Sequence, residues 1–587
     1  MRSLAKTTGI LVLCALGVAA CRAPAPPPAE SVVDERVKAL ADTYVNGYFE
    51  RNPEQLTFYG IPGRRHDRLT DNSLAALSAW ESKEDVWLAD AKGIDPAAIT
   101  SPALRATYAI VREALEGSIG ARVCRNELWS ISQVGGWQVS FGYIATIQPV
   151  GTDQARQEAL ARWSKLPGYI DTEIVNVREG LKQKYSTPKG NVRIVIEQMN
   201  SLITGTGADQ PLLSPAQRDT TPEFVRAFEA RFKSEIVPAL KRYHDFLETE
   251  YLPRAREEIG VSANPNGPAC YDAAVRQYST LPRLAKDVHQ LGLQQIDRIT
   301  AEMKTIAERS FHTADVQALL TTVRSDRQYL FKDREELIGY SEAALARAKA
   351  AAPGWFGLLP KADVVIRPYP KFREKNGPGE YNAPAEDGSR PGLYYINSYQ
   401  AEKKSKSGPE STLFHETIPG HHLQTAVALE RKEIHPIGRY IFNSGYAEGW
   451  GLYAERLADE MKLYTADLDR LGMLSAQALR ASRLVIDSGI HTMEWTRQQA
   501  IDYMLAHTTD TPEDVAAEID RYIVWPGQAT SYMLGMLEIQ RAREEATQKL
   551  GSKFDIKAFH DRVLEDGGVP LPFLAAKIRA WADSKPQ

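Results

Sequence analysis

The chain has 587 residues, of which 43% are hydrophobic and 25% are charged, an ordinary composition for a globular protein. A chain of this length can build one large core or about two or three lobes. The net charge of −4 and a pI of about 6.3 exclude a strongly basic surface, so we expect no nucleic-acid partner.

The first segment, "MRSLAKTTGILVLCALGVAAC", has the pattern of a signal peptide. Two basic residues precede an apolar run that is too short to span a bilayer, so we predict a signal peptide over residues 1–20. The ending "VAAC" resembles a bacterial lipobox, which implies cleavage before Cys21 and lipidation of Cys21. A secretory peptide cut near the same point without lipidation is the alternative.

Residues 21–33 are rich in Pro and Ala and have little to bury, so we interpret them as a tether. The protein is therefore expected in the periplasm or cell envelope. It would be held at a bacterial membrane, most simply the outer membrane, through its N-terminal lipid alone. The sequence leaves the oligomeric state open.

Four cysteines occur in the chain, and two of them belong to the export signal. Cys124 and Cys270 remain in the exported protein, where two thiols are a reasonable candidate for one disulfide. Two buried, unpaired thiols are the alternative.

Beyond the tether the pattern is mainly helical. Apolar residues recur every three or four positions in the segments 158–185, 223–251 and 284–311. Thr511 followed by Pro512 is typical of a helix start. We predict a mainly α, multi-helix fold, divided into an N-terminal lobe of residues 34–280 and a catalytic lobe of residues 281–587.

Two short runs break the helical pattern. The segments 362–370 and 392–397 are rich in β-branched and aromatic residues and are bounded by Pro and Gly. They predict a small sheet of two or three strands just before the histidine-rich segment. An extended peptide could pair with the edge of the second run, "GLYYIN".

The segment "HETIPGHHLQ" begins at His415 and concentrates three of the 11 histidines of the chain. His415 and Glu416 open like the zinc motif H-E-x-x-H, in which two histidines one turn apart bind one metal. Pro419 stands where the second ligand should fall, and it breaks a regular helix. A bulge at Pro419 and Gly420 would bring His421 to the usual position of the second ligand, with His422 as the alternative.

A third ligand is expected in "AEGWGLYAE", where Glu448 and Glu455 lie seven residues apart on one face of a predicted helix. Gly445 precedes the first glutamate, and Gly449 and Gly451 follow it. Glycines in a helix indicate close approach of another backbone or of a ligand. We predict that His415, His421 and Glu448 converge, with ring nitrogens and carboxylate about 3 to 4 Å apart. His422 would then point to a carboxylate such as Glu455 or to substrate.

These motifs together resemble the bacterial family called domain of unknown function 885. The resemblance also includes "RLVIDSGIH" (483–491) and "PGQATSYMLG" (526–535). Many members of that family are exported lipoproteins, and the family is generally regarded as one of candidate metallopeptidases. More distantly, the arrangement is similar to thermostable metallocarboxypeptidases and other helical gluzincins, which implies a zincin-like fold. In "GHHLQ", the likeness to their Gly-His-Ala-Leu-Gln favours His421 as the second ligand.

The resemblance implies one Zn²⁺ per chain, held by His415, His421 and Glu448. Glu416 would act as general base, and Tyr532 could donate a hydrogen bond to the developing oxyanion. The remaining candidates for orienting ligands or contacting substrate are His422, Glu455, Arg483, Asp487, His491 and Tyr522. Arg483, Asp487 and His491 are spaced by four and share a helix face, on which a surface charge ladder is the alternative.

Three functions are compatible with the sequence. The first is an exported zinc peptidase that acts on a peptide substrate. The second is a different metalloenzyme, because two histidines and one carboxylate also describe iron(II) oxygenase sites. The third is a binding lipoprotein without catalytic activity.

Overall fold

The computed structural model describes residues 31–61, 63–369, 379–386 and 390–584. The predicted signal peptide and the lipidation site Cys21 lie outside these residues. The first helix, α1 (Val32–Arg51), is capped by Ser31, so it includes the last two residues of the predicted tether, 32 and 33.

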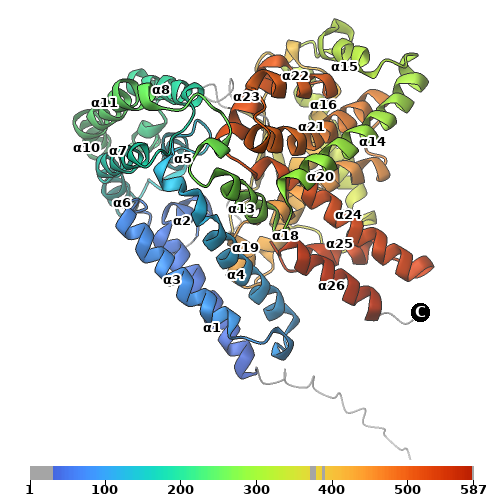
Figure 1. Cartoon of the computed structure of the whole chain (residues 1–587), viewed down its shortest axis with the longest axis horizontal. Helices are drawn as coiled ribbons and strands as arrows, with labels where there is room; N and C mark the ends of the chain where they lie inside the picture. The colour runs from blue at the N-terminus through green and yellow to red at the C-terminus, as the bar shows by residue number, and fades with distance from the viewer. Residues whose placement is uncertain (1–30, 62, 370–378, 387–389, 585–587) are drawn as a thin grey trace, which may run out of the picture.

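The described chain is mainly α-helical, as predicted (Figure 1), and also contains one small sheet. The helices of the N-terminal half are α1, α2 (Glu54–Phe58), α3 (Leu74–Lys92), α4 (Pro102–Ala121), α5 (Trp137–Ile147), α6 (Asp153–Trp163), α7 (Leu166–Lys182), α8 (Lys189–Thr204), α9 (Ser214–Gln217), α10 (Pro222–Arg231), α11 (Val237–Phe246), α12 (Leu252–Arg254) and α13 (Gly267–Ser279). Those of the C-terminal half are α14 (Ala285–Phe311), α15 (Val316–Ser325), α16 (Arg334–Ala351), α17 (Pro409–Glu416), α18 (His421–Glu430), α19 (Pro436–Tyr440), α20 (Ser444–Glu460), α21 (Asp467–Thr492), α22 (Arg497–His507), α23 (Pro512–Val524), α24 (Ser531–Leu550), α25 (Ile556–Leu564) and α26 (Leu571–Ser584).

The predicted helical segments are present, with some interruptions. The segment 158–185 is divided between α6 and α7, because a turn at Ser164 and Lys165 separates them. The segment 223–251 is continuous, but two stretches of π-helix interrupt its α-helical hydrogen bonding. Helix α23 begins at Pro512, and the Thr511 side chain accepts a hydrogen bond from the backbone of the first turn, as predicted.

The sheet contains β1 (Val364–Pro368), β2 (Glu380–Asn382) and β3 (Gly392–Ile396) in the order β1-β3-β2. Strand β1 runs parallel to β3, and β2 runs antiparallel to it. The predicted small sheet is confirmed, but the expectation that a peptide adds to the edge of β3 is wrong. Strand β3 is central because the three-residue β2, which has no strong sequence pattern, covers its second edge.

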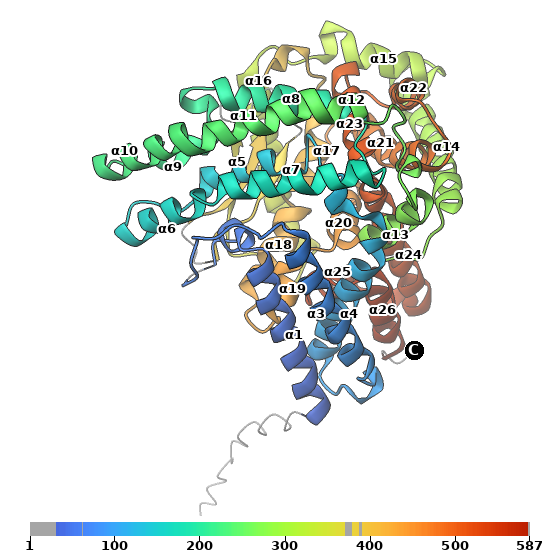
Figure 2. The same cartoon turned by 60° about the vertical axis from the view of Figure 1, so that its left-hand side comes forward.

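Buried apolar side chains form separate clusters. The largest extends from Val37 in α1 to Ala582 in α26, and a second one joins α5 to the segment around α11. In the second cluster α7, α8 and α11 lie side by side (Figure 2). The predicted division at residue 280 stays a prediction, and the largest cluster includes residues from both sides of that position.

Cys124 and Cys270 form the predicted disulfide, which links the end of the α4 segment to α13. Both cysteines belong to the largest apolar cluster, so this bond lies inside the protein. Among the helices of the described residues, none is both long enough and apolar enough to cross a membrane.

Two close helix contacts position the site. Helix α20 packs along α24, where an added Cβ on Gly449 would meet the backbone of Gly535 at 2.5 Å. Helix α14 packs along α21 through Gly292, whose Cβ would lie 2.7 Å from a methyl group of Val485. The predicted close backbone approach around Glu448 is therefore found at Gly449.

Candidate metal centre

The break in the histidine motif is a turn between two helices. Helix α17 ends at Glu416, the Ile418–Pro419 peptide bond is cis, and α18 begins at His421. The backbone nitrogen of His422 donates to the Thr417 carbonyl at 3.0 Å, which ties the start of α18 to the end of α17. Pro419 and Gly420 thus interrupt the helix where the sequence predicts an interruption.

Gly420 is required by this turn. A Cβ at this position would lie 1.9 Å from the carbonyl oxygen of His415 and 2.4 Å from that of Phe414. Because real atoms never approach so closely, any other residue would push α18 away from the end of α17. The glycine therefore sets the position of His421 relative to His415.

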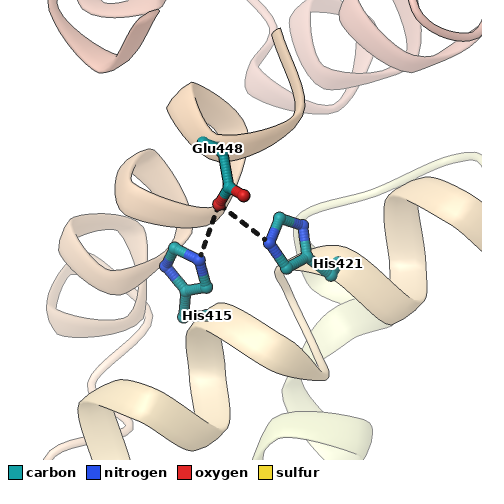
Figure 3. Close-up of side chains that lie close together, drawn as sticks. All are labelled: His415, His421 and Glu448. Atoms are coloured by element: carbon teal, nitrogen blue, oxygen red, sulfur yellow. Dashed lines mark ion pairs between the residues drawn. The ribbon is translucent and has the colours of Figure 1, made fainter. Parts of the chain in front are cut away.

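His415, His421 and Glu448 converge, as Figure 3 shows. The Nε2 atoms of both histidines lie 3.4 Å from Oε2 of Glu448, and one ligand atom from each of the three residues lies within 4.8 Å of the others. The imidazole rings are nearly perpendicular, with centroids 4.7 Å apart. Both imidazole–carboxylate distances fall in the range expected for the ligands of one small cation, about 3 to 4 Å.

Glu455 lies behind His415 on α20, two turns after Glu448. Its carboxylate accepts hydrogen bonds from Nδ1 of His415 at 2.8 Å and from the hydroxyl of Ser411 at 2.6 Å. Because Nδ1 carries the proton in this bond, Nε2 of His415 is left as an electron-pair donor facing Glu448 and His421. Such a carboxylate–histidine pair is the usual support of a metal ligand.

The charges of this cluster favour a cation. Burial alone would lower the pKa of His415, but its bonds to Glu448 and Glu455 raise that pKa to about 9. Burial would raise the pKa of Glu448, yet the two histidines hold it well below its ordinary value. Buried carboxylates of this kind need positive charge nearby, which protons or a metal ion can supply.

Gly451, on the next turn of α20, gives His415 its space. A Cβ there would lie 2.7 Å from Nε2 and Cε1 of the His415 ring. The sequence-based interpretation of the glycines near Glu448 therefore holds at this position too. Gly449 leaves room for the neighbouring helix α24, and Gly451 leaves room for the side chain of His415.

A cavity of about 1060 Å³ opens on the three converging residues. Glu416 lines it together with His415, His421 and Glu448. Burial raises the pKa of Glu416, while His421 and His415 act in the opposite direction. The residue adjacent to the first ligand thus faces the same space as the ligands, where a general base must lie.

Tyr532 lines the same cavity next to His415. Its ring stacks on that of His415 with centroids 6.3 Å apart, and the Arg483 guanidinium lies 4.4 Å from its ring centroid. Tyr522 is fully buried, and its hydroxyl accepts from Arg483 at 2.8 Å and donates to Glu518 at 2.6 Å. Tyr532 and Arg483 therefore line the cavity, whereas Tyr522 supports Arg483 from the core.

Comparison with known proteins assigns the family. A family described as "Bacterial protein of unknown function (DUF885)" matches residues 53–578. The chain belongs to this family. No curated protein matches the sequence.

Two solved structures have a similar fold. The "putative lipoprotein" from Colwellia psychrerythraea is 26% identical, with a TM-score of 0.87, over 94% of this chain and 100% of that one. A "putative lipoprotein of unknown function" from Shewanella oneidensis is 19% identical, with a TM-score of 0.73, over 92% and 99% of the two chains, and shows the fold alone.

In this DUF885 member His422 has a structural role that the sequence did not predict. It is only 1% exposed, its Nε2 donates to the Ala362 carbonyl at 2.9 Å, and its Nδ1 accepts from the Tyr381 hydroxyl at 3.1 Å. The expectation that it points to Glu455 or to substrate is wrong. The turn at Pro419 directs His421 to the cavity, so its neighbour in α18 faces the sheet.

Asp487 and His491 are also placed differently from the prediction. Asp487 accepts from the Tyr271 hydroxyl at 2.8 Å and from the backbone of Gly527 at 2.9 Å, and His491 bonds backbone groups of Val261 and Tyr522. Both side chains are fully buried, so they form no surface charge ladder. They share a face with Arg483, but among the described residues they hold backbone segments together and do not line the cavity.

Two residues near the cluster were missed by sequence reasoning. Ser411 lies one turn before His415 and bonds Glu455, a spacing that the sequence displays. Arg480 lies 3.5 Å from Glu455 and lines the cavity. Its position three residues before Arg483 on α21 could have indicated it.

Proposed function

We propose that this protein is a zinc-dependent peptidase that hydrolyses peptide bonds, with Glu416 as general base. The observation that supports it most is the convergence of His415, His421 and Glu448 beside Glu416 in one cavity. Two histidines and one glutamate form the ligand set of many helical zinc peptidases. Here the first histidine comes from the end of α17 and the second from the start of α18.

The chemistry of the donor set fits Zn²⁺. Two imidazole nitrogens and one carboxylate oxygen are borderline ligands that suit this ion, and three protein ligands are typical of catalytic rather than structural sites. Glu455 supports His415 in the way expected of a metal ligand. Zinc in such a site supplies a Lewis acid and lowers the pKa of a bound water to about 7.

In the proposed reaction Glu416 accepts a proton from the attacking water. The water oxygen bonds to the carbonyl carbon, the carbon–nitrogen bond breaks, and the proton passes through Glu416 to the leaving amine. Tyr532 is the group on the cavity wall beside His415 that can donate a hydrogen bond to the oxyanion. The products are a carboxylate and an amine, so water alone balances the equation.

The cavity favours a short or flexible peptide as substrate. Its volume of about 1060 Å³ is at the upper end of small-ligand sites, and its walls come from segments as distant as Phe58 and Gly568. Residues of β2 line it, and in the described residues β2 pairs on one side only. An extended substrate would therefore pair with β2 and not with β3.

The proposed location is the cell envelope. The protein from Colwellia psychrerythraea, which has a similar fold, is described as a putative lipoprotein, and "VAAC" in this chain resembles a lipobox that ends at Cys21. The protein would act outside the cytoplasm, attached through its N-terminal lipid. Attachment to the outer membrane belongs to this same proposal.

Metal analysis and peptide hydrolysis test the function together. We expect about one zinc per chain in protein purified without added metal, hydrolysis of an unstructured peptide mixture, and loss of hydrolysis with a chelator that added zinc reverses. Iron instead of zinc, with no hydrolysis, would favour an oxygenase. Protein that neither holds a metal nor cleaves peptides when loaded with zinc would contradict the proposal.

A further inference from the structure

One side of the cavity is a set of aromatic side chains from three separate segments. The aromatic wall consists of Phe58, Tyr59, Tyr143, Tyr440 and Phe442, all of which line the cavity. Phe58 ends α2, Tyr143 lies in α5, and Tyr440 ends α19. The N-terminal part of the chain thus contributes to a cavity whose candidate metal ligands all come from residues 415–448.

Four rings of the aromatic wall, all except that of Phe442, contact one another in the described structure. Phe58 packs edge-on against Tyr59 with centroids 5.1 Å apart and lies 6.1 Å from Tyr143. Tyr59 in turn lies 5.2 Å from Tyr440. Ring pairs at these separations stabilise each other, so these four rings form a preformed surface, beside which Phe442 lines the same cavity.

The polar ends of the tyrosines are directed to protein partners. Tyr59 donates to the Tyr440 carbonyl at 2.9 Å, Tyr143 donates to the amide oxygen of Asn382 at 2.9 Å, and the Tyr440 hydroxyl donates to Glu386. Because each hydroxyl has a partner, the orientation of each ring is restricted. The parts of the rings that face the cavity are therefore apolar.

Two members of the wall remain exposed although they are large and apolar. Phe58 is 46% exposed and Phe442 is 65% exposed. They are the phenylalanines among the exposed large hydrophobic residues of the described chain, and both line this cavity. Exposed aromatic surface concentrated in a concave site is typical of a ligand contact.

The aromatic wall is continuous with the candidate metal centre. Phe442 precedes α20, and Ser444, Ala447 and Glu448 of that helix line the cavity after it. A group bound at Phe442 would therefore lie along the same helix that carries the third candidate ligand.

We propose that the aromatic wall binds a bulky apolar side chain of the peptide substrate, close to the bond that is cleaved. The inference rests on the proposed function, which it sharpens by naming the substrate class. Burial of one phenylalanine or leucine side chain against this wall would favour such peptides by about 10- to 100-fold over glycine at the same position.

Two pentapeptides test the inference on the zinc-loaded protein, Ala-Ala-Phe-Ala-Ala and Ala-Ala-Gly-Ala-Ala. We expect the ratio of their kcat/KM values to be about 10 to 100 in favour of the first, with cleavage next to the phenylalanine. Phe442→Ala and Phe58→Ala should each lower this ratio several-fold. Leu284→Ala removes a side chain that is 52% exposed outside the cavity, so it should leave the ratio unchanged.

Cleavage of both peptides at equal rates would overturn the inference and leave the proposed function intact. So would a preference that survives both phenylalanine substitutions. Absence of all cleavage would contradict the proposed function, and calorimetric titration of the Glu416→Gln protein then decides the inference alone. Tighter binding of the phenylalanine peptide, weakened by Phe442→Ala, would support the wall as a binding subsite, and equal affinities would refute it.

Discussion

Helix α20 and the junction between α17 and α18 both deliver candidate ligands to the same centre, by different structural means. In α20 a regular helix places Glu448 at the cluster and Glu455 behind His415, because seven residues make two turns. At the junction the helix is interrupted at Pro419, and the interruption brings His421 beside Glu448. The regular helix α20 positions Glu448 and Glu455, and the interrupted helix at the junction positions His421.

Rules based on residue spacing apply to a continuous helix and not across a turn. A periodic rule finds residues on a continuous helix, so Glu448 and Glu455 could be placed from their separation alone. Helical spacing does not continue through a turn, so only the packing of the turn decides which of two adjacent histidines faces the cavity. Substitutions at the junction and on α20 separate these two contributions.

The junction is tested first by replacing each of its two adjacent histidines with alanine in separate variants. We expect His421→Ala to lose zinc and hydrolysis together, with affinity for the metal lowered by more than about 100-fold, since even residues that only support ligands change affinity by 10- to 100-fold. His422→Ala should retain one zinc per chain, because His422 bonds the sheet region. Metal content after dialysis measures both.

An exposed histidine gives the control for this pair. His312→Ala should behave as the unchanged protein, because His312 is exposed at the end of α14. Loss of zinc from the His422 variant, with zinc retained by the His421 variant, would reverse the assignment of the second ligand.

The next variant separates metal binding from catalysis at the end of α17. Glu416→Gln should keep zinc near one per chain and lower kcat by about 10²- to 10⁴-fold, the usual contribution of a general base. The reason is that Glu416 lines the cavity but is not one of the three converging residues. If the glutamine variant loses its metal, Glu416 is itself a ligand and the assigned roles are wrong.

On the regular helix, Glu455 is the residue to change. Glu455→Gln weakens the bond to Nδ1 of His415, so zinc affinity should fall by about 10- to 100-fold while a zinc-saturated sample keeps most of its activity. Glu460→Gln is the matched control, because Glu460 lies on the same helix and pairs with Arg543 away from the cluster. Competition with a chelator of known affinity measures both, and equal affinities would show that Glu455 does not support the ligand.

These residues also show how much of the fold and of the candidate site can be predicted from the sequence. The mainly α fold, the disulfide and the small sheet follow from periodicity and cysteine count. The convergence of three ligands follows from motif spacing only together with the family resemblance, which favours His421 as the second ligand. The direction of His422 depends on the Pro419–Gly420 turn, and the central place of β3 depends on a three-residue partner strand with no pattern of its own. Asp487 and His491 share the predicted face with Arg483, but spacing does not reveal which part of a long buried helix faces a cavity.

Gly449 and Gly451 lie on the same stretch of α20 and allow the smallest effects to be compared. Alanine has the higher helix propensity by about 1 kcal/mol, so either Gly→Ala change would stabilise an isolated helix. At Gly449 the new methyl group meets the Gly535 backbone at 2.5 Å, whereas at Gly451 it meets the His415 ring at 2.7 Å. A packed backbone cannot move as an imidazole can, so Gly449→Ala should destabilise the fold by about 1–3 kcal/mol.

Gly451→Ala should leave the unfolding free energy of metal-free protein nearly unchanged and lower zinc affinity about tenfold, as a displaced ligand would. Denaturant unfolding in chelator and zinc competition measure the two quantities separately, and a Gly451 variant with normal zinc affinity would show that His415 moves aside without loss of its ligand position.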